Sequence, residues 1–150
     1  FNVFLAAQIY FKDTSLLSKN EHVGDLVTIV GDVHHIFPKA YLKKNGITSK
    51  VDTNQVANYT YLASDVNKSI ADRAPEDYFD VVWKQCNNGD LGDQKPIEGV
   101  IDDLDELKSN LAANCIPDGI RHMTVENYAE FLDERRSLMA QKIKQYYEAL

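Results

Sequence analysis

The sequence predicts a mostly helical α+β domain with one small sheet, and three observations lead to this fold class. From Thr124 onward, apolar residues recur every three or four positions, which is typical of an amphipathic helix that faces a core. Two short stretches, "LVTIV" at 26–30 and "YTYLA" at 59–63, are rich in β-branched and aromatic residues and favour strands. The chain has 150 residues, of which 44% are hydrophobic and 26% charged, and this fits one globular domain over residues 1–150.

The first predicted elements are a helix, a strand and a second, shorter helix. Residues 1–12 carry apolar side chains at a spacing that suits a helix. The stretch 26–30 has the length of a strand, although the end of a helix would look similar. Pro38 is expected to end strand pairing, because proline has no N–H to donate. A short helix at 40–46 should then stop at Gly46.

A second strand and a run of helices are expected after a turn-rich segment. The strand at 59–63 precedes a helix that runs to residue 73, and Ser64 and Asp65 are its candidate N-caps. Further helices are predicted at 75–86, at 101–115 and from 124 onward, with a loop at 87–96. The strands therefore belong to a core at about 26–73, and a helical region follows at 75–150.

The charge of the chain limits its partners. A net charge of −7 argues against a general polyanion binder, because affinity for DNA depends mainly on basic residues that face phosphates. The charge is uneven, however. Residues 34–73 contain six basic and three acidic side chains, a local charge of +3, while the rest of the chain carries −10. A modestly basic window thus lies within an acidic protein, although charge blocks are often only solvated surface.

Two cysteines and the apolar segments indicate the environment of the protein. Cys86 and Cys115 are 29 positions apart and outside any CxxC spacing, so we expect two free, buried or half-buried thiols in a reducing cytoplasm. The longest apolar stretches are too short to cross a membrane. The chain starts at Phe1 rather than Met and enters an apolar stretch at once, from which we expect a C-terminal piece of a longer protein.

The most informative local feature is the histidine doublet in "GDVHHIFPKAYL", residues 31–42. Successive residues of a strand point to opposite faces, so the imidazoles of His34 and His35 would be separated unless the backbone bends beside them. Asn58 opens the second predicted strand, and Asn67 follows nine positions later in the helix. A strand, a loop, a strand and a helix in this order could bring residues from the end of one strand and from the helix to a single metal ion. Taken singly, Asn58 could be a turn former. Asn67 could be a residue at the start of a helix whose side chain accepts hydrogen bonds from backbone N–H groups there.

In this order, the segments "HHIFPKAYL", "NQVANYTYL", "SDVNKSIADRAPEDYF" and "YAEFLDERRSLM" resemble the HNH nucleases with a ββα-metal fold. More narrowly, they are similar to the C-terminal HNH domain of GmrSD-type restriction endonucleases, over roughly residues 25–145. "SDVNKSIADRAP" also resembles the HNH domain of RNA-guided CRISPR nucleases. The resemblance implies a ββα-metal motif embedded in a helical domain, which hydrolyses DNA phosphodiesters in a restriction or phage-defence system. In that family, a ParB-like N-terminal domain that uses nucleotide precedes this one.

The resemblance also implies a role for each residue of the motif. His35 is expected to be the general base that takes a proton from the attacking water, a task that suits a neutral imidazole. His34 and Asn67 correspond to the protein ligands of one divalent metal ion. Asn58 is the central asparagine, expected to hydrogen-bond the backbone of the loop and hold the His35 segment. The ion could be Mg²⁺, or Mn²⁺, Ni²⁺ or Zn²⁺, which imidazole favours more.

DNA is the expected partner, and basic residues of the window are candidates for phosphate contacts, although each alone could be ordinary solvated surface. They are Lys39, Lys43, Lys44, Lys68 and Arg73. The competing hypothesis is a catalytically inactive helical module that docks DNA or another protein, and the net charge of −7 keeps it open. The sequence does not indicate the oligomeric state.

Overall fold

The computed structural model describes residues 1–29 and 33–150. Over these residues the chain has a mostly helical α+β fold, as predicted, with one two-stranded antiparallel sheet. The helices are α1 (Asn2–Tyr10), α2 (Val23–Ile29), α3 (Lys39–Lys44), α4 (Lys50–Thr53), α5 (Ser64–Ile70), α6 (Pro75–Cys86), α7 (Leu104–Ala113) and α8 (Tyr128–Ala149). The strands are β1 (His34–His35) and β2 (Tyr59–Thr60), and the 3₁₀ turns are η1 (Val56–Asn58), η2 (Ile120–His122) and η3 (Val125–Asn127).

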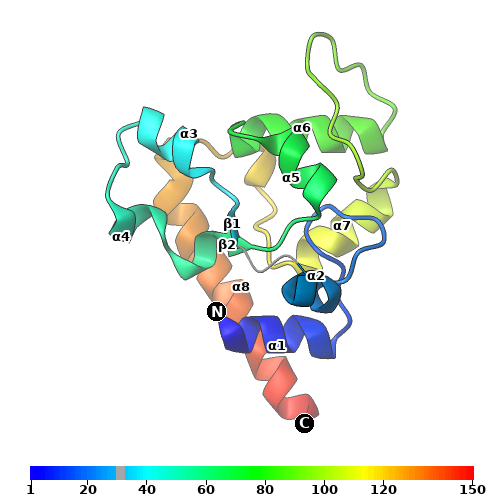
Figure 1. The fold of residues 1–150 in the computed structure, drawn as a ribbon, viewed down its shortest axis with the longest axis vertical. Helices are drawn as coiled ribbons and strands as arrows, with labels where there is room; N and C mark the ends of the chain where they lie inside the picture. The colour runs from blue at the N-terminus through cyan, green and yellow to red at the C-terminus, as the bar shows by residue number, and fades with distance from the viewer. Residues whose placement is uncertain (30–32) are drawn as a thin grey trace.

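The small sheet joins two segments that are distant in sequence. β1 and β2 are antiparallel, with His34 opposite Thr60 and His35 opposite Tyr59. Between the strands the chain makes an excursion through α3 and α4, and α5 begins shortly after β2 (Figure 1). The chain therefore has the strand, loop, strand and helix order that the sequence predicts. Each strand has only two residues, so the predicted strand at 59–63 is longer than the one observed.

The long helix α8 packs its apolar face against the segment that follows the histidines. Phe131 is fully buried, and its ring centre lies 4.8 Å from that of Phe37, while the ring of Tyr128 lies 5.1 Å from the same side chain. The predicted core-facing stripe is therefore present in the first part of the helix. Its end differs, because Tyr147 and Leu150 are 60% and 73% exposed. In Figure 1 this last part of α8 extends past α1 and away from the body of the domain.

One predicted strand is wrong. Residues 26–29, expected to form a strand, belong to α2, and residue 30 lies outside the described residues. Val23 and Leu26, three positions apart, are both buried, as neighbours on one face of a helix are, while Ile29 at the end of the helix is 78% exposed. The β-branched residues favoured a strand locally, but helical burial of one face outweighs that preference here.

The predicted N-caps of α5 are also wrong. Ala63 occupies the N-cap position, and its side chain makes no capping hydrogen bond. Asp65 lies two residues further on, where its Oδ1 accepts the N–H of the adjacent Val66, at 2.9 Å. The other boundaries are close to expectation. α3 ends with Asn45 as C-cap and Gly46 at a φ of +89°, a backbone conformation that favours glycine.

The expectation of two free cysteines is confirmed. Cys86 and Cys115 are free thiols, the first half-buried and the second buried. Within the described residues, none of the helices combines the length and apolar character needed to cross a bilayer.

On α6, Asp80 forms ion pairs with Lys84 at 2.8 Å and with Arg121 at 3.0 Å. The pair with Arg121 connects the helix to η2.

Candidate active site

The histidine doublet forms strand β1, and the backbone bends directly after it. His34 and His35 are both half-buried, and Ile36 and Phe37 form the bend. Pro38 then serves as the N-cap of α3, so strand pairing stops before the proline, as predicted. Residues 30–32, which include the first two residues of the predicted motif, lie outside the described part of the chain.

Asn58 binds the backbone of this bend with its side chain. It is completely buried. Its Oδ1 accepts the N–H of Phe37 at 2.8 Å, and its Nδ2 donates to the carbonyl of Phe37 at 3.1 Å and to that of Thr53 at 3.5 Å. The backbone carbonyl of Asn58 also accepts the N–H of Ile36 at 2.9 Å. One side chain therefore fixes both polar backbone groups of the residue two positions after His35.

Two buried side chains from later helices hold the same region. Tyr78 on α6 donates its hydroxyl to the carbonyl of Ile36 at 2.5 Å. Arg135 on α8 donates Nη1 to the carbonyls of Ala57 and Tyr59, at 2.8 and 2.6 Å, on either side of the central asparagine. Burial lowers the pKa of Arg135 to about 10, so the guanidinium stays charged near neutral pH.

Sequence reasoning gave neither of these two residues a role in the site. Arg135 could nevertheless have been recognised from the sequence. It lies four positions after Phe131 and four before Met139, and thus shares the buried face of α8. An arginine in the middle of an apolar stripe needs buried carbonyl or carboxylate partners. Tyr78 could not have been recognised in this way, since an aromatic residue in an amphipathic helix is an ordinary core residue.

His35 has a defined environment. Its Nε2 lies 3.1 Å from Oδ1 of Asn54, and its ring forms a T-shaped pair with the ring of Tyr59 at a centre-to-centre distance of 5.3 Å. Burial lowers the pKa of His35; the hydrogen bond with Asn54 opposes this effect, and the nearby charges of Lys39 and His34 add to it. The imidazole is therefore mostly neutral at pH 7, the form that can accept a proton.

His34 and Asn67 are the two predicted metal ligands. His34 lies opposite Thr60 in the sheet, and Asn67 lies on α5, seven positions after Thr60. Asn67 is half-buried, and its side-chain amide has no hydrogen-bond partner among the described residues. One imidazole nitrogen and one amide oxygen suit a divalent ion that takes its other ligands from water and phosphate. That both bind one ion stays a prediction.

A larger metal cluster is not found in the described part of the chain. No group of three or more His, Cys, Asp or Glu side chains there could hold a metal ion. A site built from His34 and Asn67 would not count as such a group, because it has two protein ligands and only one of them, the histidine, is among these four residue types. The donor set therefore fits a lightly coordinated ion rather than a closed structural centre.

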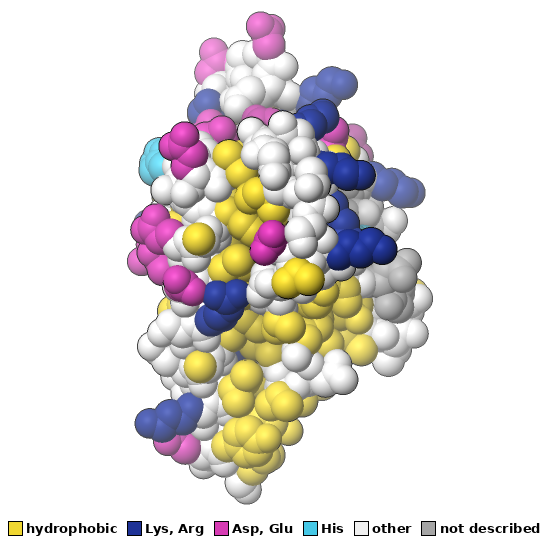
Figure 2. Space-filling view, turned by 90° about the vertical axis from the view of Figure 1, so that its left-hand side faces the viewer, with side chains coloured by type: hydrophobic (Ala, Val, Ile, Leu, Met, Phe, Trp, Pro, Cys, Tyr) yellow, Lys and Arg dark blue, Asp and Glu magenta, His cyan; other side chains and the backbone are white. Residues whose placement is uncertain are grey.

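The predicted phosphate-binding residues differ in whether their side chains already form ion pairs within the protein. Lys39, Lys43 and Lys68 are exposed and form no ion pair with another described residue. Lys44 is exposed too, and its Nζ lies 3.3 Å from a carboxylate oxygen of Asp72. In Figure 2, Lys and Arg side chains gather along one edge of the face shown. Of these lysines, Lys39 influences the charge of His35.

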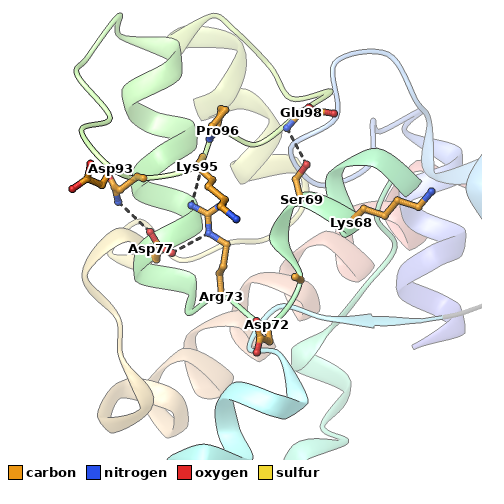
Figure 3. Close-up of a pocket in the computed structure, with 11 residues that line it drawn as sticks. Lys68, Ser69, Asp72, Arg73, Asp77, Asp93, Lys95, Pro96 and Glu98 are labelled. Carbon is orange, nitrogen blue, oxygen red and sulfur yellow. Dashed lines mark hydrogen bonds and ion pairs between the residues drawn. The ribbon is translucent and has the colours of Figure 1, made fainter.

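Arg73 has partners within the protein. Its Nε donates to Oδ2 of Asp77 at 2.9 Å, and its Nη2 donates to the carbonyl of Lys95, also at 2.9 Å. These contacts line an open hollow of about 700 Å³ beside α5 (Figure 3). In the same view Lys68 extends away from Arg73. Of the two, Lys68 is the better candidate for contact with phosphate, because the guanidinium of Arg73 already ties the loop before residue 97 to α6.

Comparison with known proteins gives little further information. The chain is 26% identical over 119 residues to the uncharacterized protein MJ0686 of Methanocaldococcus jannaschii. The match covers 73% of this chain and 20% of the archaeal protein, so the chain spans about a fifth of that relative's length. No model of a known protein family and no solved structure matches the chain. The comparisons therefore assign no activity, and the function has to be argued from the site.

Proposed function

We propose that the chain is a metal-dependent HNH endonuclease domain that hydrolyses phosphodiester bonds of DNA. The observation that carries the proposal is the contact of Asn58 with both backbone groups of Phe37, directly after the histidine strand. This is the bracing role that the resemblance to HNH nucleases implies for the central asparagine. The antiparallel pair of strands followed by α5 supports the proposal, because it is the ββα order of that family.

The proposed reaction uses His35 as general base. Its neutral imidazole accepts a proton from a water molecule while the water oxygen forms a bond to phosphorus. The bond from phosphorus to the 3′-oxygen breaks, and that oxygen leaves with a proton taken from solvent. A divalent ion, Mg²⁺ or alternatively Mn²⁺, Ni²⁺ or Zn²⁺, would stabilise the negative charge on the phosphoryl and leaving oxygens. His34 and Asn67 would hold it, and Lys39, Lys43 and Lys68 would contact neighbouring phosphates.

The wider setting is part of the proposal. A chain that spans a fifth of its relative leaves room for further domains in a longer protein. A ParB-like, nucleotide-using domain is the partner that the resemblance implies, within a restriction or phage-defence system in the cytoplasm. Such a domain would also supply affinity for DNA, which an acidic domain with a charge of −7 provides only weakly.

Plasmid nicking tests the proposal. The wild-type chain should convert supercoiled plasmid to the nicked form only when Mg²⁺ or Mn²⁺ is added, and His35→Ala should abolish this conversion. His122→Ala is the matched control, because His122 is exposed and lies outside the site. Undiminished nicking by His35→Ala would remove this histidine from the mechanism.

Metal titration separates the proposed nuclease from the inactive docking module. Calorimetry with Mn²⁺ should show binding by the wild-type chain and much weaker binding by His34→Ala and Asn67→Ala. If the wild-type chain binds none of Mg²⁺, Mn²⁺ and Ni²⁺, the docking module becomes the better description.

A further inference from the structure

The contact between Asn54 and His35 contains information about the protonation of the imidazole. Nε2 of His35 and Oδ1 of Asn54 are 3.1 Å apart, which is a hydrogen-bond distance. An amide oxygen is an acceptor only, so the imidazole nitrogen must supply the hydrogen. A neutral imidazole has one N–H, and therefore the lone pair resides on Nδ1.

Asn54 is itself held in place. It is the C-cap of α4, where its N–H donates to the carbonyl of Lys50 at 2.9 Å. Its own carbonyl accepts the hydroxyl of Tyr59 at 3.2 Å. The ring of that tyrosine is nearly perpendicular to the ring of His35, at 83°. The imidazole is therefore positioned by an amide and an aromatic ring that are connected to each other.

We infer that Asn54 is a positioning residue that keeps the proton of His35 on Nε2 and leaves Nδ1 as the nitrogen that deprotonates water. The catalytic part of this inference rests on the proposed nuclease function. The tautomer itself does not, because the contact exists whatever the protein does. In the same way a buried acceptor orients the base of other hydrolases, where loss of the correct tautomer lowers the rate by orders of magnitude.

Nuclear magnetic resonance of the metal-free, ¹⁵N-labelled chain tests the tautomer directly. The wild-type spectrum should contain an Nε2–H proton of His35 that exchanges slowly with water, and His35→Gln identifies this signal by removing it. Asn54→Leu should lose the slow exchange, whereas Asn54→Asp should keep it because a carboxylate is also an acceptor. Asn45→Leu is the matched control, since Asn45 is the C-cap of α3 and is exposed, and among the described residues its side chain hydrogen-bonds only the carbonyl of Tyr41.

Activity provides the second readout. At saturating Mn²⁺, Asn54→Leu should slow plasmid nicking roughly 10- to 100-fold, the size expected when a catalytic group is misplaced by about 1 Å. Its affinity for Mn²⁺ should stay unchanged, Asn54→Asp should restore most of the rate, and Asn45→Leu should nick like the wild type.

Two results would overturn the inference. One is a wild-type spectrum with the proton on Nδ1, which requires no variant and so does not depend on whether Asn54→Leu folds. The other is an Asn54→Leu chain with the wild-type Nε2–H signal and the wild-type nicking rate. If the wild-type chain binds none of Mg²⁺, Mn²⁺ and Ni²⁺ while the Nε2–H signal is present, the nuclease proposal fails and the tautomer assignment stands.

Discussion

Replacement of Asn58 by alanine measures how strongly the bend after the histidines is held. The side chain is fully buried and supplies partners for the N–H and the carbonyl of Phe37 and for the carbonyl of Thr53. Alanine leaves the two groups of Phe37 buried without their side-chain partner, and each such loss costs about 1–3 kcal/mol. We therefore expect Asn58→Ala to lower the free energy of unfolding by roughly 2–6 kcal/mol, a large share of the stability of an ordinary domain.

Urea unfolding followed by circular dichroism gives this free energy, and hydrogen exchange locates the loss. The amide of Phe37 should exchange slowly in the wild type and much faster in Asn58→Ala, because its acceptor is gone. Asn45→Ala is the control, as its exposed amide makes one local bond and should cost under about 1 kcal/mol. If Asn58→Ala costs no more than this control, the brace does not exist in solution.

Three further variants test polar contacts made by α6 and α8. Arg135→Met should cost at least about 3 kcal/mol in urea unfolding, because three carbonyls, two of them in buried hydrogen bonds, lose a charged donor; a neutral effect would contradict this. Tyr78→Phe should cost about 1–3 kcal/mol through the carbonyl of Ile36, and an unchanged melting curve would argue against that bond. Partial burial raises the pKa of Asp80, but its bonds with a lysine and an arginine outweigh this and hold it below 3.8. The contribution of Asp80 is then present above pH 4 and is lost as the pH falls through the lowered pKa, so Asp80→Asn should lose more stability at pH 6 than at pH 2; equal losses at both would refute the assignment.

Much of the helical fold follows from the sequence, because helical burial leaves a periodic pattern. α6 and α8 could be located from the spacing of apolar residues and, for α6, from Pro75 at its start. The strand predicted at 26–30 was wrong because a short apolar run has no clear period. The two observed strands are hard to predict from sequence because each has only two residues and their pairing depends on side chains from elsewhere in the fold.

The candidate site was predictable only in part. His34, His35, Asn58 and Asn67 could be singled out by their order and spacing, and the structure places the first three on or beside the sheet. Asn54 could not be found this way. Its contact with His35 spans 19 positions and depends on the path of α4, for which the turn-rich segment gave no periodic signal.

The way the site is held favours a role that needs fixed geometry. A two-stranded ribbon is only marginally stable alone, so the position of His35 depends on what surrounds β1 and β2. Asn58, Tyr78 and Arg135 are 0%, 2% and 1% exposed, and each directs polar atoms at backbone groups of these strands or the bend. Buried polar side chains generally stabilise a fold no better than apolar ones that fill the same space, yet they fix direction as well as distance. A docking surface would gain little from such control over one imidazole, whereas a general base depends on it. The buried polar contacts behind the histidines therefore favour catalysis over docking.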